Sequence, residues 1–126
     1  FQGGFMKHSS NVVRAKAEVI GVDVKNPANE SLGSICEVML DKLTGKVTYV
    51  VLESGAILGL GGKLFAIPWN AINFDANKAC FILNIDKESL KSAPGFDKDH
   101  WPDMADRAFG TTVTDFYRSS SDTFIE

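Results

Sequence analysis

The sequence is poor in the residues from which metal and nucleophilic sites are built. Its 126 residues include only two cysteines and two histidines. Cys36 and Cys80 stand 44 positions apart, each in an apolar run, so they form no CxxC pair and a zinc site is not expected. Two small buried thiols are the preferred interpretation, and a disulfide is the alternative.

Sequence motifs of catalysis are lacking as well. No GxSxG elbow, HExxH pair or cysteine–histidine arrangement occurs. His100 lies near Asp97, Asp99 and Asp103, which suggests a metal site or an acid–base pair, but a solvated helix start explains the cluster and is preferred. The sequence therefore predicts a protein that is not an enzyme and that uses no metal or cofactor.

Long apolar runs and a strong positive charge are also absent. No stretch approaches the ~18–20 apolar residues of a membrane-spanning helix. The formal net charge is −3 and the basic residues are dispersed singly, so nucleic acid is not the expected partner. The cytoplasm is the default localisation. Removal of a native N-terminal signal segment is an alternative that stays open, because Phe1-Gln2-Gly3 resembles the remnant of a cleaved purification tag. Residues 1–5 are therefore set aside.

A glycine-rich run at residues 54–62 does not have the spacing of a phosphate-binding loop. It fits neither GxxxxGK[ST] nor GxGxxG, and a strand rather than a helix is predicted to follow it. Nucleotide binding is therefore not expected. Instead, we expect Ile57, Leu58 and Leu60 to contact an apolar surface, either of the C-terminal extension or of a second chain.

The middle of the chain is rich in strand signals. Turn clusters at residues 26–29 and 41–45 separate short apolar and β-branched segments. No helix long enough to connect parallel strands lies between them, which excludes a βαβ architecture. The prediction is a mainly β fold, a small closed or half-closed barrel of five to six strands at residues 12–86, with Trp69 closing one end. The predicted strands cover residues 22–25, 32–40, 46–53, 63–68, 71–74 and 79–85.

The apolar period changes after residue 86. From residue 101 onward it is helical, which predicts an amphipathic extension within residues 87–118 and a frayed tail at 119–126. Pro102 suits the first helical position, and Gly110 leaves open whether there is one helix or two. The predicted apolar stripe consists of Trp101, Met104, Ala105, Ala108, Phe109, Val113, Phe116 and Tyr117.

This stripe is too apolar to remain in water. It must cover the barrel of its own chain or of a second chain, and the break at Pro94-Gly95 permits an exchange between chains. A barrel of about 70 residues is also near the lower size limit for independent stability. We therefore expect a homodimer. Its expected contact residues are Ile57, Leu58, Leu60, Trp101, Met104, Phe109, Phe116 and Tyr117.

Several short motifs resemble, in their order and spacing, the PRC-barrel domain. That family is named for the cytoplasmic part of the photosynthetic reaction centre H subunit, and it includes the C-terminal half of a bacterial ribosome maturation factor. Ile67-Pro68-Trp69 resembles the end of a family strand, and residues 93–97 together with 101–104 resemble the extension of stand-alone bacterial members. The other similar segments are residues 17–24, 32–35, 40–41 and 59–66.

The resemblance implies a fold and a mode of action rather than a reaction. The family is similar to other small β-barrels that serve as adaptor or assembly modules, and its pattern contains no catalytic residues. The expected function is therefore a non-catalytic protein-interaction or assembly module, homodimeric, with an unidentified partner protein. A ribosome- or RNA-associated assembly factor is the alternative, by analogy with the ribosome-bound member.

Overall fold

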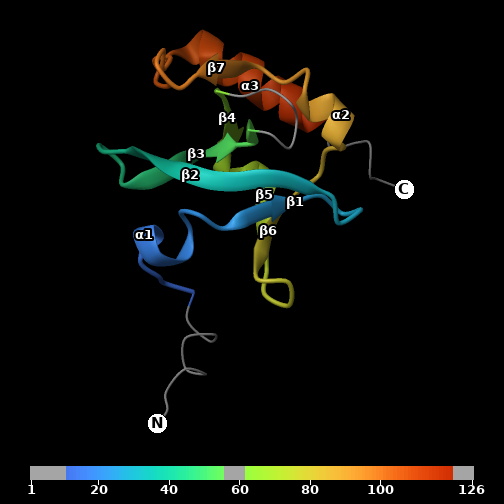
Figure 1. Cartoon of the computed structure of the whole chain (residues 1–126). Helices are drawn as coiled ribbons and strands as arrows, with labels where there is room; N and C mark the ends of the chain where they lie inside the picture. Colours follow the sequence, from blue (N-terminus) through green and yellow to red (C-terminus); the bar gives the residue numbers. More distant parts are fainter. Residues whose placement is uncertain (1–10, 56–61, 121–126) are drawn as a thin grey trace.

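The computed structural model describes residues 11–55 and 62–120, which fold into one mixed sheet flanked by helices (Figure 1). The sheet consists of β1 (Asp23–Lys25), β2 (Ser31–Asp41), β3 (Lys46–Glu53), β4 (Lys63–Pro68), β5 (Ile72–Asp75), β6 (Cys80–Leu83) and β7 (Gly95–Asp97). The helical elements are α1 (Ala15–Glu18), α2 (Lys87–Leu90), α3 (Arg107–Ser120) and the 3-10 turn η3 (Trp69–Ala71).

The mainly β prediction is confirmed, but the sheet that the described residues form has seven strands and is not closed into a barrel. Its order is β5-β6-β1-β2-β3-β4-β7, so β5 and β7 are its two edges. The six predicted strands are present, whereas β7 was expected to be helical or irregular. Gly95 lets β7 lie against β4, because a Cβ atom there would stand 3.0 Å from the Leu64 carbonyl oxygen.

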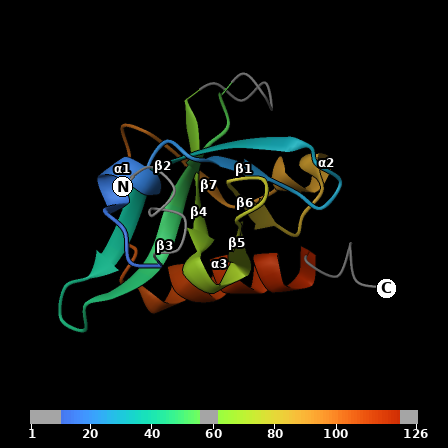
Figure 2. The ribbon, with the colours of Figure 1, turned by 90° about the horizontal axis from the view of Figure 1, so that it is seen from below.

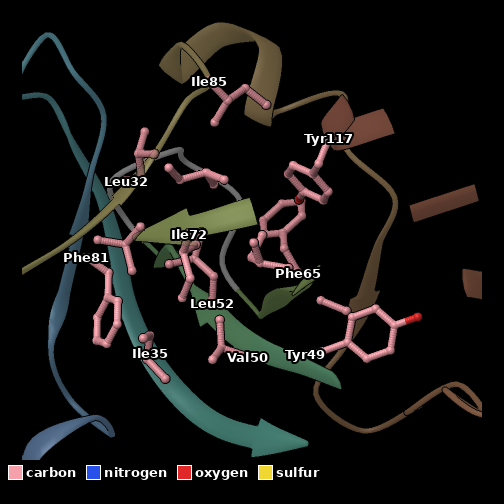
Figure 3. Packing of buried hydrophobic residues seen from close by; sticks show 14 of the residues in the cluster. Leu32, Ile35, Tyr49, Val50, Leu52, Phe65, Ile72, Phe81, Ile85 and Tyr117 are labelled. Atoms are coloured by element: carbon pink, nitrogen blue, oxygen red, sulfur yellow. The ribbon is translucent and has the colours of Figure 1, made fainter. Parts of the chain in front are cut away.

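Strands β3 and β4 are the centre of the fold because their middle residues are buried on both faces. The antiparallel register places Val50 opposite Ile67 and Leu52 opposite Phe65, and these four side chains lie in the main apolar cluster (Figure 3). Ile35 of β2 lies opposite Leu52 and extends the same layer. The β-branched and aromatic composition that predicted these strands therefore also supplies the core.

Two buried polar side chains connect loops to this core. The Asn26 side-chain amide donates to Glu30 Oε1 at 2.7 Å and to the Ile85 carbonyl oxygen at 3.1 Å, and its Oδ1 accepts from the Glu30 N–H. The Ser54 hydroxyl donates to the Leu32 carbonyl oxygen at 2.7 Å. Both groups exchange water for protein partners, so their burial carries little desolvation cost.

Helix α3 is one continuous helix that lies across the end of β4 (Figure 2). It begins at Arg107, so the predicted start at Pro102 is wrong: the Asp103 carboxylate instead accepts from the Ala105 N–H in a turn. Gly110 does not break the helix. Its missing side chain permits contact with β3, because a Cβ atom would stand 3.2 Å from the Tyr49 hydroxyl oxygen.

Candidate interaction surface

The structure turns most of the predicted apolar stripe toward the sheet of the same chain. Tyr117 is 4% exposed, and Met104, Phe109 and Phe116 are partly buried against the main cluster. The apolar area that suggested a homodimer through α3 is therefore covered within one chain. Ala105 and Ala108, which the spacing placed on the stripe, are exposed. Ile57, Leu58 and Leu60 lie outside the described residues.

Trp101 remains 42% exposed, but it has a local structural role. Its indole N–H donates to the Lys98 carbonyl oxygen at 2.9 Å, and its ring centroid lies 5.0 Å from that of Phe96 in β7. These contacts hold the turn that leads from β7 toward α3. Trp101 therefore acts as an anchor of its own loop, in a segment that the sequence predicted to be helical.

A different group of aromatic side chains reaches the surface at the opposite edge of the sheet. Trp69 is 39% exposed and Phe74 is 54% exposed, and both lie over the buried Phe81. Their ring centroids stand 6.1 Å and 5.1 Å from that of Phe81. We call Trp69, Phe74 and Phe81 the aromatic surface. The expectation that Trp69 closes a barrel end is wrong, because η3 turns the chain directly after Pro68 and leaves the indole partly in solvent.

Strand β5, which carries Phe74, is a free edge. It pairs with β6 on one side, and the strand order in the described part of the chain places nothing on its other side. Its sequence Ile72-Asn73-Phe74-Asp75 contains neither the lysine nor the proline that commonly protects an edge strand. The Asp75 carboxylate is engaged in the following turn, where it accepts from the Asn77 and Lys78 N–H groups. An exposed aromatic side chain and unpaired strand backbone thus coincide.

The sequence analysis did not single out Phe74 as a candidate interaction residue. Residues 71–74 were predicted to form a strand, and alternation along a strand places Ile72 and Phe74 on the same face. Ile72 is buried and Phe74 is exposed, because Phe74 lies farther along the strand toward the β5–β6 turn. Only the position of the strand at the edge of the sheet reveals this exposure.

The cysteines are free thiols, which excludes the disulfide alternative. Cys80 is buried and Cys36 is partly exposed. Burial, together with the carboxylates of Glu53 and Glu37, raises the pKa of the Cys36 thiol to about 11. At neutral pH Cys36 is therefore protonated and a poor nucleophile.

A metal centre does not assemble in the part of the chain that the structure describes: no cluster of three or more His, Cys, Asp or Glu side chains occurs there. His100 is exposed, and its backbone N–H donates to the Asp97 carbonyl oxygen in a turn. Within residues 11–55 and 62–120, no helix combines the length and hydropathy that crossing a membrane requires.

Comparison with protein families gives one match. The model of the PRC-barrel domain matches residues 12–90, from before α1 to the end of α2. The aromatic surface lies inside the matched region, whereas β7 and α3 follow it. Comparison with curated proteins finds no match.

Proposed function

This chain belongs to the PRC-barrel domain family, and on that premise we propose that it is a non-catalytic protein-interaction module that binds through the aromatic surface and the free edge of β5. One observation carries the proposal. Two large aromatic side chains, Trp69 and Phe74, are exposed beside a sheet edge on which the described part of the chain places no pairing strand. Tryptophan and other aromatic residues are enriched at the energetically dominant centres of protein interfaces.

The two features of this edge support each other physically. Unpaired N–H and C=O groups of β5 accept an extended segment by main-chain hydrogen bonds, which is the basis of strand addition. The rings of Trp69 and Phe74 add apolar area, and burial contributes about 25 cal/mol per Å². The backbone supplies geometry and the rings supply most of the free energy of association.

We propose further that a second copy of the chain is a partner. A twofold contact presents the same patch on both subunits, so two β5 edges pair with each other and each aromatic surface is covered by its symmetry mate. The proposed dimer contact therefore differs from the one that the sequence predicted. The apolar side chains of α3 pack within one chain, so the contact lies instead at β5, the edge of the sheet opposite β7.

Sedimentation velocity tests the proposal. At tens of micromolar we expect the wild type to be a dimer and the double variant Trp69→Ser/Phe74→Ser to be a monomer with an unchanged circular dichroism spectrum. Trp101→Ser is the matched control, because Trp101 has similar exposure but lies away from β5. A monomeric wild type at this concentration would disprove the homodimer, and a dimeric double variant would disprove the assigned surface.

A further inference from the structure

A cavity of about 370 Å³ lies between η3, the β5–β6 hairpin and the C-terminal half of α3. Asn70, Asn73 and Asn84 line one side, and Thr114 and Arg118 of α3 line the other. Ile82 contributes an apolar part of the wall. This volume lies within the range of about 300–1,000 Å³ that is typical of binding sites, which combine apolar walls with a few convergent polar groups.

The three asparagine side chains are uncommitted. Within the residues that the structure describes, the amides of Asn70, Asn73 and Asn84 make no side-chain hydrogen bond, whereas that of Asn26 makes three. An asparagine amide offers two N–H donors and a carbonyl acceptor. Three such groups around one cavity therefore present both donors and acceptors to whatever enters it.

The charge of the wall argues for a neutral ligand. Among the residues that the structure describes, Arg118 is the one charged residue that lines the cavity, and its guanidinium lies 3.3 Å from the Asp115 carboxylate. The Asp115 carboxylate offsets the charge of that guanidinium, so the wall carries little net charge to attract an anion such as phosphate. A peptide group, in contrast, is neutral and carries one N–H donor and one C=O acceptor, which an asparagine amide complements.

We propose that this cavity binds the backbone of an extended peptide segment, with an apolar side chain of that segment against Ile82. The inference rests on the proposed function, because the segment would belong to a partner protein. The placement agrees with strand geometry: alternation in β5 directs Phe74 to one face and Asn73 to the other. A segment that follows the free edge would place alternate side chains beside the aromatic surface and beside the asparagines.

The test is a titration followed by ¹H–¹⁵N NMR, with N-acetyl-leucinamide as the probe because it has two neutral amide groups and one apolar side chain. The protein is the Trp69→Ser/Phe74→Ser variant, so dimerisation does not compete for the site. We expect the side-chain NH₂ signals of Asn70, Asn73 and Asn84 to shift along one saturable curve with a millimolar Kd. The Asn26 signals are the internal control, since that amide is buried and hydrogen-bonded.

The variant Asn73→Ala/Asn84→Ala should weaken binding of the probe at least about tenfold, the loss that corresponds to about 1.4 kcal/mol. Absence of a saturable shift would overturn the inference. An equal response to sodium acetate or sodium phosphate would also overturn it, since the site would then select charge. Because the titration uses a variant without the aromatic surface, binding of the probe would support the cavity even if the wild type proved monomeric.

Discussion

The family-matched region at residues 12–90 and the segment that follows it are stabilised differently. The matched region contains most of the aliphatic core, and its buried Asn26 and Ser54 side chains are hydrogen-bonded. Among its described residues, the following segment adds two buried apolar side chains, Val113 and Tyr117. The Tyr117 hydroxyl points into the apolar cluster toward Phe65 (Figure 3), and among the described residues it is the buried side-chain polar atom without a hydrogen-bond partner.

The difference indicates that the sheet is stable by itself and that α3, which we call the cover, is held less firmly on it. A buried hydroxyl without a partner costs about 1–3 kcal/mol, which offsets part of the apolar gain from docking α3. The ion pair of α3, Arg118 with Asp115, has side chains 73% and 62% exposed and contributes little. We infer that α3 opens before the sheet does, with the apolar contacts of Val113 and Tyr117 as its main restraint.

The largest effect should come from a single methyl group in the sheet. At Gly33, φ is +140° and a Cβ atom would overlap the Glu53 carbonyl oxygen, so Gly33→Ala forces backbone movement between β2 and β3. We expect a loss of about 3 kcal/mol in the free energy of unfolding, measured by urea denaturation. Gly45→Ala is the matched control: its φ is +79° with no atom within 4 Å, so strain alone costs about 1 kcal/mol. Equal losses would contradict the close approach.

A deletion in the cover should have a smaller and more local effect. Val113→Ala removes two methyl groups from a fully buried site and should cost about 2 kcal/mol, while Thr111→Ala on the exposed face is near neutral. Hydrogen exchange should show faster opening of α3 in the Val113 variant, with β3 amides still protected. If the amides of α3 and of β3 in the wild type exchange with the same free energy of opening, α3 does not open separately from the sheet.

High pH should destabilise the cover through Tyr117. Burial raises the pKa of Tyr117 far above its ordinary value. Below about pH 10 both states keep the proton. Above that pH the unfolded state releases it and the folded state does not, so stability falls by up to about 1.4 kcal/mol per pH unit.

The matched comparison is denaturation between pH 9 and 11 (about one unit on each side of the ordinary tyrosine pKa) for the wild type, Tyr117→Phe and Tyr49→Phe. Burial also raises the pKa of Tyr49. Both variants should therefore lose less stability than the wild type as the pH rises, and the difference should be larger for Tyr117→Phe. A decline of equal slope in the wild type and in Tyr117→Phe would show that the Tyr117 hydroxyl is not desolvated.

At neutral pH, Tyr117→Phe should have the smallest effect of these substitutions, and it should stabilise the protein whereas the others destabilise it. Tyr117→Phe removes a hydroxyl without a partner and keeps the ring, so we expect stability to rise by about 1 kcal/mol. Thermal unfolding of Tyr117→Phe beside Tyr49→Phe checks this, because the Tyr49 hydroxyl points away from the cluster (Figure 3). A destabilised Tyr117→Phe variant would mean that the hydroxyl makes a stabilising contact.

The sequence alone predicted the six strands from β1 to β6 because each combines strong local signals: β-branched or alternating apolar residues between turn clusters. The predicted turn at residues 41–45 is present between β2 and β3, where Gly45 has a φ of +79°. Strand β7 could not be predicted, because three residues beside Pro94-Gly95 carry no periodicity and their strand conformation depends on pairing with β4. The start of α3 was misplaced since Trp101 and Met104 are apolar at helical spacing yet pack from a turn.

The candidate site shows the same division. Trp69 was singled out from the sequence, but its exposure, the neighbourhood of Phe74 and the free edge of β5 depend on strand order. The three asparagines around the cavity come from η3, β5 and the residue after β6, and no spacing in the sequence unites them. Local propensity and periodicity report which residues extend or coil. Which strand forms an edge, and which side chains share a cavity, follows from long-range packing, because contacts between distant segments have no local signature.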